Sequence, residues 1–402
     1  MPLKPSERYA YQLIFMSDAY DITIVMPCLN EADTLATCIE KAHLGLKRAG
    51  VRGEILIADN GSTDGSVQIA EKIGARVVHV KEKGYGNALK GGIEAAQARW
   101  IIMGDADDSY DFSEIEGFVK KLREGNDLVM GCRLPRGGGK VLPGAMPFSH
   151  RWIGNPMFTV MARHMFSSPI NDVYCGLRAF TRNLYDRLDL RCQGMEFATE
   201  MIIKSSINGA KIAENPITLH PDGRKAHAPH LKTFRDGWRT LRFFMIFSPR
   251  WLFLYPGILL AALGIAGYFI ALPGLEIHGI KFDAHTLLFA SLAILLGYQS
   301  ILFAIFAKTF AINEGLLPAD AAMKRFFDIV YLERGLLIGF GSFLAGVALL
   351  AAAVAQWWSV RFGVLDYSHT MRWVIPGVTL TALGFQTILS SFFVSILGMK
   401  RR

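Results

Sequence analysis

Residues 100–107 read WIIMGDAD, an apolar run that is followed by a glycine and two carboxylates. A short, continuous apolar run bounded by turn residues is typical of a buried strand. Two earlier runs have the same form: residues 22–26 end at Pro27, and residues 54–58 lead into the turn sequence DNGS. In all three, polar side chains begin where the apolar run stops, so each predicted strand carries polar groups at its carboxyl end.

Helical patterns separate these strands. The expected helices span residues 33–49, 64–74, 86–99 and 113–124. A further strand is expected at 77–80. Strands that alternate with helices of this length predict an α/β domain with a mostly parallel sheet covered on both faces. In such sheets, ligands bind beyond the carboxyl ends of the strands. The acidic residues gather at those ends, which is the first indication of a functional site.

Charged residues are distributed unevenly, because only 17 of the 78 follow Arg250. The remainder of the chain contains uncharged runs that each exceed the roughly 18–20 apolar residues needed to cross about 30 Å of hydrocarbon as a helix. We therefore expect four membrane-spanning helices, at about residues 252–275, 286–307, 335–358 and 373–399. The expected organisation is an N-terminal extension (1–20), the α/β domain (21–230), an amphipathic helix (231–250) and a transmembrane region (251–402).

Basic residues flank the expected spans unequally. Only Lys281 follows the first span, and only Arg361 and Arg372 follow the third. The connection after the second span and the C-terminal tail are richer in basic residues: Lys308, Lys324, Arg325, Arg334, Lys400, Arg401 and Arg402. The positive-inside rule then places both termini and the α/β domain in the cytoplasm. The only apolar run before the predicted strand at 22–26, residues 13–16, is too short for a signal peptide, which agrees with that orientation.

Residues 231–247 show two neighbouring helical stripes. One is apolar (Leu231, Phe234, Trp238, Leu241) and the other is basic (Lys232, Arg235, Arg239, Arg242). Such a helix just before a membrane span is expected to lie among lipid headgroups; the alternative is a helix packed on the domain. The net charge of +8 suits anionic lipid, and no nucleic-acid module is recognisable. The five cysteines form no CxxC pair, so neither a disulfide framework nor a zinc site is indicated.

Asp105 and Asp107 form the central chemical motif. Two carboxylates at this spacing after a strand suit a hard cation such as Mg²⁺ or Mn²⁺, which usually shares them with substrate phosphates and would neutralise a diphosphate leaving group. The same pattern also occurs in exposed turns. Asp59 suits either a nucleobase edge or a turn. The Gly84–Gly86 segment suits either close approach to phosphate or a plain turn. Neither a Walker A loop nor a GxGxxG after the first strand is present, so kinases and dehydrogenases lose support.

Several motifs together carry a family resemblance. The sequences PCLNE (27–31), DNGSTD (59–64) and DAD (105–107) resemble, in order and spacing, the nucleotide-sugar motifs of glycosyltransferase family 2. The later motifs GCR (131–133), HRWIGN (150–155) and DVYCGLR (172–178) resemble its polyisoprenyl-phosphate branch, which includes dolichol-phosphate mannose and glucose synthase-like enzymes. The resemblance covers roughly residues 20–250, and the QxxRW motif of processive synthases is absent.

This resemblance implies a GT-A fold, an inverting mechanism and a lipid-phosphate acceptor. It places Pro27, Leu29, Glu31, Asp59, Asn60, Asp105 and Ala106 on the nucleotide sugar, Asp105 and Asp107 on the metal, and Arg133, Arg151 and Asn155 on the acceptor phosphate. The implied catalytic residues are Asp107, Arg133, Arg151 and Asp172. Two departures from the family pattern stand out. Asn60 replaces a second aspartate found in many relatives, and Ser109 replaces a glutamine that some mannose synthases place near the metal.

The expected reaction transfers one hexose from a nucleotide diphosphate sugar, with UDP-glucose as the preferred donor, to a polyprenyl phosphate in the bilayer. Phosphate monoesters have a second pKa near 6, so the attacking oxygen is already anionic and needs cations rather than a base. Asp172 is then expected to orient an arginine or the sugar. A processive polysaccharide synthase and a catalytically degenerate, lipid- or partner-binding protein are the alternatives. The sugar, nucleobase, polyprenyl length and any homo-oligomer stay open.

Overall fold

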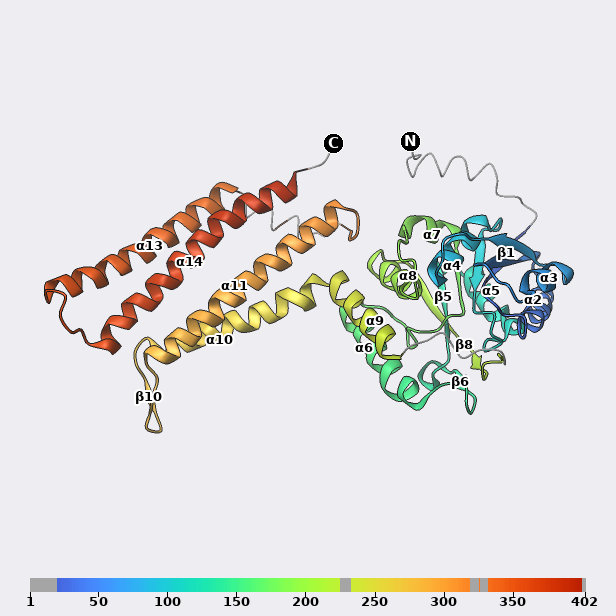
Figure 1. Cartoon of the computed structure of the whole chain (residues 1–402), viewed down its shortest axis with the longest axis horizontal. Helices are drawn as coiled ribbons and strands as arrows, with labels where there is room; N and C mark the ends of the chain where they lie inside the picture. The colour runs from blue at the N-terminus through green and yellow to red at the C-terminus, as the bar shows by residue number, and fades with distance from the viewer. Residues whose placement is uncertain (1–19, 225–232, 319–324, 326–331, 400–402) are drawn as a thin grey trace. The chain divides into compact units, whose positions relative to one another are not determined.

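The computed structural model describes residues 20–224, 233–318, 325 and 332–399. The expected extension at 1–19, Leu231, Lys232, Lys324 and the basic tail 400–402 lie outside these residues. The chain divides into two compact units, residues 1–244 and 245–402, which are drawn in Figure 1 and are described separately below.

The first unit is built on a seven-stranded sheet of order β3-β2-β1-β4-β7-β5-β8. β7 is antiparallel to β4 and β5, while every other pairing is parallel. The mostly parallel sheet predicted from the sequence is therefore confirmed. Its strands are β1 (Ile22–Cys28), β2 (Gly53–Asp59), β3 (Arg76–His79), β4 (Trp100–Met103), β5 (Leu128–Cys132), β7 (Arg178–Thr181) and β8 (Ile212–Pro216).

Helices connect these strands, in the alternation expected from the sequence. They are α2 (Leu35–Ala49), α3 (Ser66–Lys72), α4 (Tyr85–Ala95), α5 (Glu116–Arg123), α6 (Asn155–Phe166), α7 (Arg182–Leu188), α8 (Glu196–Ile207) and α9 (Thr233–Phe247). The helix expected at 86–99 already ends at Ala95, because residues 96–99 are needed to lead into β4. The helix expected at 113–124 is split into a short 3₁₀ turn, η1 (Phe112–Glu114), and α5.

The central strands form the core of this unit. Ile24, Val25 and Met26 of β1 and Ile101 and Ile102 of β4 are completely buried. Both faces of a parallel sheet are covered by helices, so its strands are apolar without alternation. Since β1, β2 and β4 run parallel, their carboxyl ends lie at one edge of the sheet. A small second sheet pairs β6 (Lys140–Val141) with β9 (Thr218–Leu219) and holds the segment that follows β8.

The second unit consists of long apolar helices. Four candidate spans are described: Arg250–Ala271, which joins the turn η4 (Arg250–Leu254) to α10 (Tyr255–Ala271), then α11 (Ala284–Asn313), α13 (Leu332–Ser359) and α14 (Tyr367–Gly398). All four predicted spans are thus present. A hairpin of β10 (Glu276–Ile277) and β11 (Ile280–Lys281) joins α10 to α11.

Small residues let these helices approach closely. A Cβ added at Gly297 of α11 would lie 2.5 Å from the backbone nitrogen of Ala261 in α10, and one added at Gly384 of α14 would meet the backbone of Phe343 in α13. Close packing at small residues is a main source of helix association in lipid, where apolar surfaces gain little from contact with each other. The two hairpins, α10 with α11 and α13 with α14, are assembled in this way.

α9 combines the two alternatives weighed for residues 231–247. Its Phe244 is fully buried, edge-on against Phe158 and Phe166 of α6 with ring centroids 5.9 and 5.5 Å away. Trp238 nevertheless leaves 59% of its surface exposed, and Arg242 is exposed too. One face of the helix therefore packs on the α/β domain, whereas Trp238 and Arg242 stay exposed and Arg239 lies 3.7 Å from the carboxylate of Glu196.

Candidate active site

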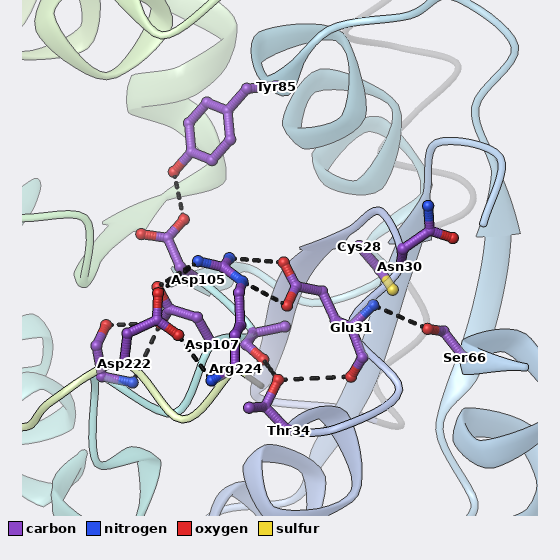
Figure 2. A network of polar contacts seen from close by, with 12 residues as sticks. Cys28, Asn30, Glu31, Thr34, Ser66, Tyr85, Asp105, Asp107, Asp222 and Arg224 are labelled. Carbon is purple, nitrogen blue, oxygen red and sulfur yellow. Dashed lines mark hydrogen bonds and ion pairs between the residues drawn. The ribbon is translucent and has the colours of Figure 1, made fainter. Parts of the chain in front are cut away.

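The three motifs predicted at the strand ends meet at one edge of the sheet. Asn60 follows β2 and donates its backbone N–H to the carbonyl of Cys28 in β1, at 2.9 Å. The hydroxyl of Thr34, just before α2, donates to the carbonyl of Ala106 at 2.6 Å. Figure 2 shows the resulting network around Glu31, Asp105 and Asp107. Parallel pairing of β1 with β2 and β4 brings these distant segments together.

Asp105 is held from two sides. One carboxylate oxygen accepts a hydrogen bond from the hydroxyl of Tyr85, at 2.8 Å. The other oxygen would lie 2.8 Å from a Cβ placed on Gly176, so any larger residue at that position would push against it. Burial, and then the charge of Asp107, raises the pKa of Asp105 to about 6. A nearby cation would stabilise the charged form of this carboxylate.

Asp107 has one oxygen engaged by its own loop and one turned toward a cation. Its Oδ1 accepts from the backbone N–H and the hydroxyl of Ser109, at 3.1 and 2.6 Å. Its Oδ2 accepts from Nη1 of Arg224 at 3.3 Å. Ser109, which departs from the mannose-synthase pattern, thus orients Asp107. Positive charge already sits where the sequence predicted a metal ion.

Arg224 is the site residue that the sequence analysis missed. Its guanidinium forms a two-pronged ion pair with Glu31, at 2.7 and 2.6 Å, and also contacts Asp107 and Asp222. Figure 2 shows it between Glu31 on one side and Asp107 and Asp222 on the other. Against the effect of burial, hydrogen bonds to Glu31 and the surrounding carboxylates raise the pKa of Arg224 above its ordinary value. No spacing rule connects residue 224 to residue 31, so only the folded chain reveals this contact.

The polar groups of Asp59 and Asn60 are used within their own loops. Asp59 accepts from the backbone of Gly61 and Ser62 and lies 3.0 Å from Nδ1 of His79. Although burial alone raises its pKa, these hydrogen bonds hold the pKa of Asp59 below its usual value. Asn60 donates to two carbonyls after β3 and accepts from the N–H of Gly84. Both residues therefore fix the loop after β2, and Asn60 links that loop to the start of α4.

Three further expectations concern the neighbouring loops. Asp64 accepts from the backbone N–H groups of Ser66 and Ala32, so it holds the turn before α3, whose N-cap is Gly65 and carries no side-chain cap. Leu29 has 38% of its surface exposed, while Pro27 lies within β1. The close backbone approach at Gly84–Gly86 is made by residues 192–194: a Cβ on Gly84 would lie 2.6 Å from the carbonyl oxygen of residue 193. The glycines at 84 and 86 therefore allow this segment to pack against the backbone of residues 192–194.

Arg133 and Asp172 form a buried ion pair. Nε and Nη2 of Arg133 donate to the two carboxylate oxygens of Asp172 at 2.7 and 2.8 Å, and the backbone N–H of Arg133 donates as well, at 3.0 Å. Asp172 is fully buried and Arg133 nearly so. Against the effect of burial, the charge of Asp172 raises the pKa of Arg133 well above its ordinary value. Asp172 thus fixes the orientation of this guanidinium.

Arg151 lies in a different setting. It belongs to η3 (His150–Gly154), a π-helical turn that runs into α6, and its guanidinium sits 5.4 Å from the ring centroid of Trp152. Among the residues that the structure describes, no carboxylate pairs with it, and its Nε is buried without a partner. Asn155, at the start of α6, is buried and donates to the sulfur of Met146 at 3.5 Å.

Several large apolar side chains of the segment that carries Arg151 are exposed. We call them the α6 apolar strip: Phe148, Trp152, Ile153, Met157 and Val160. Their exposed fractions run from 46% to 73%. A run of exposed apolar groups on one short element marks a surface that meets a lipid or a partner. The Arg151 guanidinium therefore lies on a segment with an exposed apolar surface, beside Trp152 and with its Nε lacking a hydrogen-bond partner.

The site offers two carboxylates to a metal ion. Within the described ranges, no group of three or more histidines, cysteines, aspartates or glutamates is arranged to hold one. Mg²⁺ does not require such a cage, because it usually binds through one or two carboxylates together with substrate phosphates. Asp105 and Asp107 fit that mode, and Asp107 faces the positive guanidinium of Arg224 at 3.3 Å.

Comparison with known proteins agrees with this architecture. The pattern described as "Glycosyl transferase family 2" matches residues 23–189, and "Glycosyltransferase family 2 C-terminal transmembrane region" matches residues 305–398. The low-salt glycan biosynthesis hexosyltransferase Agl6 of Haloferax volcanii is 35% identical over 378 residues, 94% of this chain and 89% of its own. The chain belongs to glycosyltransferase family 2. The predicted GT-A domain followed by a transmembrane region is thereby confirmed.

Two further similarities are more limited. The dolichyl-phosphate hexose transferase of the same organism is 29% identical over 217 residues, which cover 54% of this chain and 89% of that relative. Among solved structures, glucosyl-3-phosphoglycerate synthase of Mycobacterium tuberculosis, in complex with Mn²⁺, uridine diphosphate and glucosyl-3-phosphoglycerate, covers 61% of this chain and 83% of its own, at 19% identity and a TM-score of 0.43.

Proposed function

We propose that this glycosyltransferase transfers a single hexose from a nucleotide diphosphate sugar to a polyprenyl phosphate, with inversion at the sugar and with a divalent cation, at the cytoplasmic face of the membrane. UDP-glucose is the proposed donor. The observation that carries the proposal is Arg151: an arginine without a described carboxylate partner, set within the α6 apolar strip. That combination suits a ligand with an anionic head and an apolar tail.

The chemistry of such an acceptor explains the choice of side chains. An acceptor phosphate oxygen attacks the anomeric carbon, the bond from that carbon to the diphosphate breaks, and the nucleoside diphosphate leaves. No proton has to be removed, because a phosphate monoester is already largely dianionic at neutral pH. Asp172 agrees with this, since both of its oxygens are occupied by Arg133. A carboxylate held in this way orients a guanidinium and is a poor proton acceptor.

Arg133 and Arg151 lie in different surroundings and bind different parts of the substrates. Arg133 is rigid and buried, which suits a fixed positive charge beside the reacting phosphate groups. Arg151 lies at the apolar surface, which suits capture of the acceptor head as its tail stays in lipid. Guanidinium groups provide paired, planar donors that match phosphate oxygens. Asp105 and Asp107 would hold the divalent cation, which when bound supplies Lewis-acid stabilisation of the leaving diphosphate.

The test is direct. The full chain, purified in detergent, is given a panel of radiolabelled nucleotide sugars with polyprenyl phosphate, and lipid-extractable sugar is counted. We expect one donor to give a polyprenyl monophosphate sugar and Arg151→Ala to lower the lipid-dependent rate at least tenfold. Arg187→Ala, an exposed arginine of α7, is the matched control and should keep the rate. Polymeric product, or transfer to water-soluble acceptors only, would refute the proposal.

A further inference from the structure

Arg224 forms ion pairs with the carboxylates around Asp107, where a metal ion would also bind. One guanidinium faces three carboxylates, those of Glu31, Asp107 and Asp222, and its four contacts with them lie between 2.6 and 3.3 Å. Its side chain is only 12% exposed. One positive charge against three negative ones leaves this cluster anionic. A nucleotide diphosphate would add more negative charge at the same place.

The backbone before Arg224 is hydrogen-bonded to the loop after β4 that carries Asp107. The N–H of His220 donates to the carbonyl of Ser109, and the N–H of Gly223 donates to the carbonyl of Asp107, both at 3.0 Å. A Cβ on Gly223 would lie 3.0 Å from the side chain of Thr34, so the segment fits closely against the loop. Arg224 therefore reaches Asp107 from a backbone that is hydrogen-bonded to the loop carrying Asp107.

The neighbouring acidic residue is arranged differently. Asp108, which adopts a left-handed conformation (φ 60°), turns away to Lys41, whose ammonium lies 2.7 Å from its carboxylate. The Asp108 charge is thus neutralised locally by Lys41. Arg224 is the cation that faces Asp107, and a divalent ion on Asp107 Oδ2 would have to take the place of its Nη1.

We infer that Arg224 is a resident counter-cation that competes with the divalent metal ion for Asp107, so that the metal binds well only together with the nucleotide. This rests on the proposed use of Asp107 as a metal ligand. Two cations cannot share one carboxylate oxygen without repulsion, so metal alone must displace the guanidinium at a cost. A bound diphosphate gives the displaced guanidinium new acceptors, which removes that cost. Metal and nucleotide then strengthen each other's binding reciprocally.

The inference is tested by metal binding rather than by turnover. Free Mn²⁺ is measured by electron paramagnetic resonance during titration of the full chain in detergent, first without nucleotide and then with uridine diphosphate. Arg224→Ala and the less disruptive Arg224→Gln are compared with the unchanged protein, and Lys41→Ala is the matched control. Thermal unfolding of each variant identifies those that keep the fold.

We expect the unchanged protein to bind Mn²⁺ weakly alone and much more tightly with uridine diphosphate. Both Arg224 variants should bind Mn²⁺ alone about tenfold more tightly, which corresponds to ~1.4 kcal/mol, and should gain less from the nucleotide. Lys41→Ala should behave like the unchanged protein. Equal or weaker Mn²⁺ binding by the folded Arg224 variants would overturn the inference, and so would an equal gain in Lys41→Ala. Absence of sugar transfer to polyprenyl phosphate, with this Mn²⁺ pattern intact, would reject only the proposed acceptor.

Discussion

Replacing Asp172 by asparagine removes one charge from the buried pair with Arg133 while keeping the shape of the side chain. Asp172 is completely buried and holds Arg133 through three hydrogen bonds. Removing one partner of a buried ion pair leaves an uncompensated charge and typically costs roughly 3–5 kcal/mol. In a unit of this size each 1 kcal/mol lowers Tm by about 2–4 °C, so Asp172→Asn should lower Tm by roughly 6–20 °C.

Thermal unfolding of the full chain in detergent, followed by tryptophan fluorescence, measures this change. Arg187→Ala is the control, because its ion pair with Asp127 is exposed and 3.8 Å long, and exposed pairs contribute at most about 1 kcal/mol. A double variant, Arg133→Met with Asp172→Leu, removes both charges and should recover most of the lost stability. The double variant should transfer no sugar, because the buried guanidinium is gone. A Tm for Asp172→Asn within about 2 °C of the unchanged protein would refute the reasoning.

Three further outcomes are expected. Asp107→Asn should abolish transfer without a change in the unfolding transition, because Arg224 keeps its ion pairs with Glu31 and Asp222; near-normal transfer, or full activity without divalent cations, would argue against the metal assignment. In intact cells, an impermeant thiol reagent should label Val364→Cys, which is fully exposed in the connection between α13 and α14, but not Pro318→Cys after α11; the reverse pattern would overturn the positive-inside orientation. Combining Trp152→Ser with Ile153→Ser should lower the rate with polyprenyl phosphate while uridine diphosphate affinity, measured by calorimetry, stays constant; an unchanged lipid-dependent rate would remove the α6 apolar strip from acceptor capture.

Local pattern was sufficient for the architecture. The apolar runs before Pro27, Asp59 and Asp105 lie in β1, β2 and β4, since a strand buried on both faces has no polar alternation and stands out in the sequence. The four spans were equally readable, because a helix in hydrocarbon needs a long uncharged run whatever its neighbours are. Element ends were less certain. The helix expected to reach residue 99 stops at Ala95, where the chain must turn into β4.

The contacts between site residues could be identified only in the folded structure. The motif residues were identified from sequence, and Asp172 was expected to orient an arginine or the sugar. That this arginine is Arg133, and which groups pair with Glu31 and Asn60, was not predicted. Glu31 meets Arg224 across 193 positions, and Asp172 meets Arg133 across 39. No periodicity or spacing links such pairs, because the chain brings them together only when the sheet and its loops have formed.

Sequence alone therefore determined which elements form and which residue types stand at the strand ends, because backbone propensity and hydrophobic pattern act over a few neighbouring positions. Tertiary structure alone decided how the charges are matched. It gives Arg133 a fixed carboxylate, leaves Arg151 within the α6 apolar strip, and places Arg224 on Asp107. The physical reason is range: an ion pair forms between groups a few ångströms apart in space, however far apart they are along the chain.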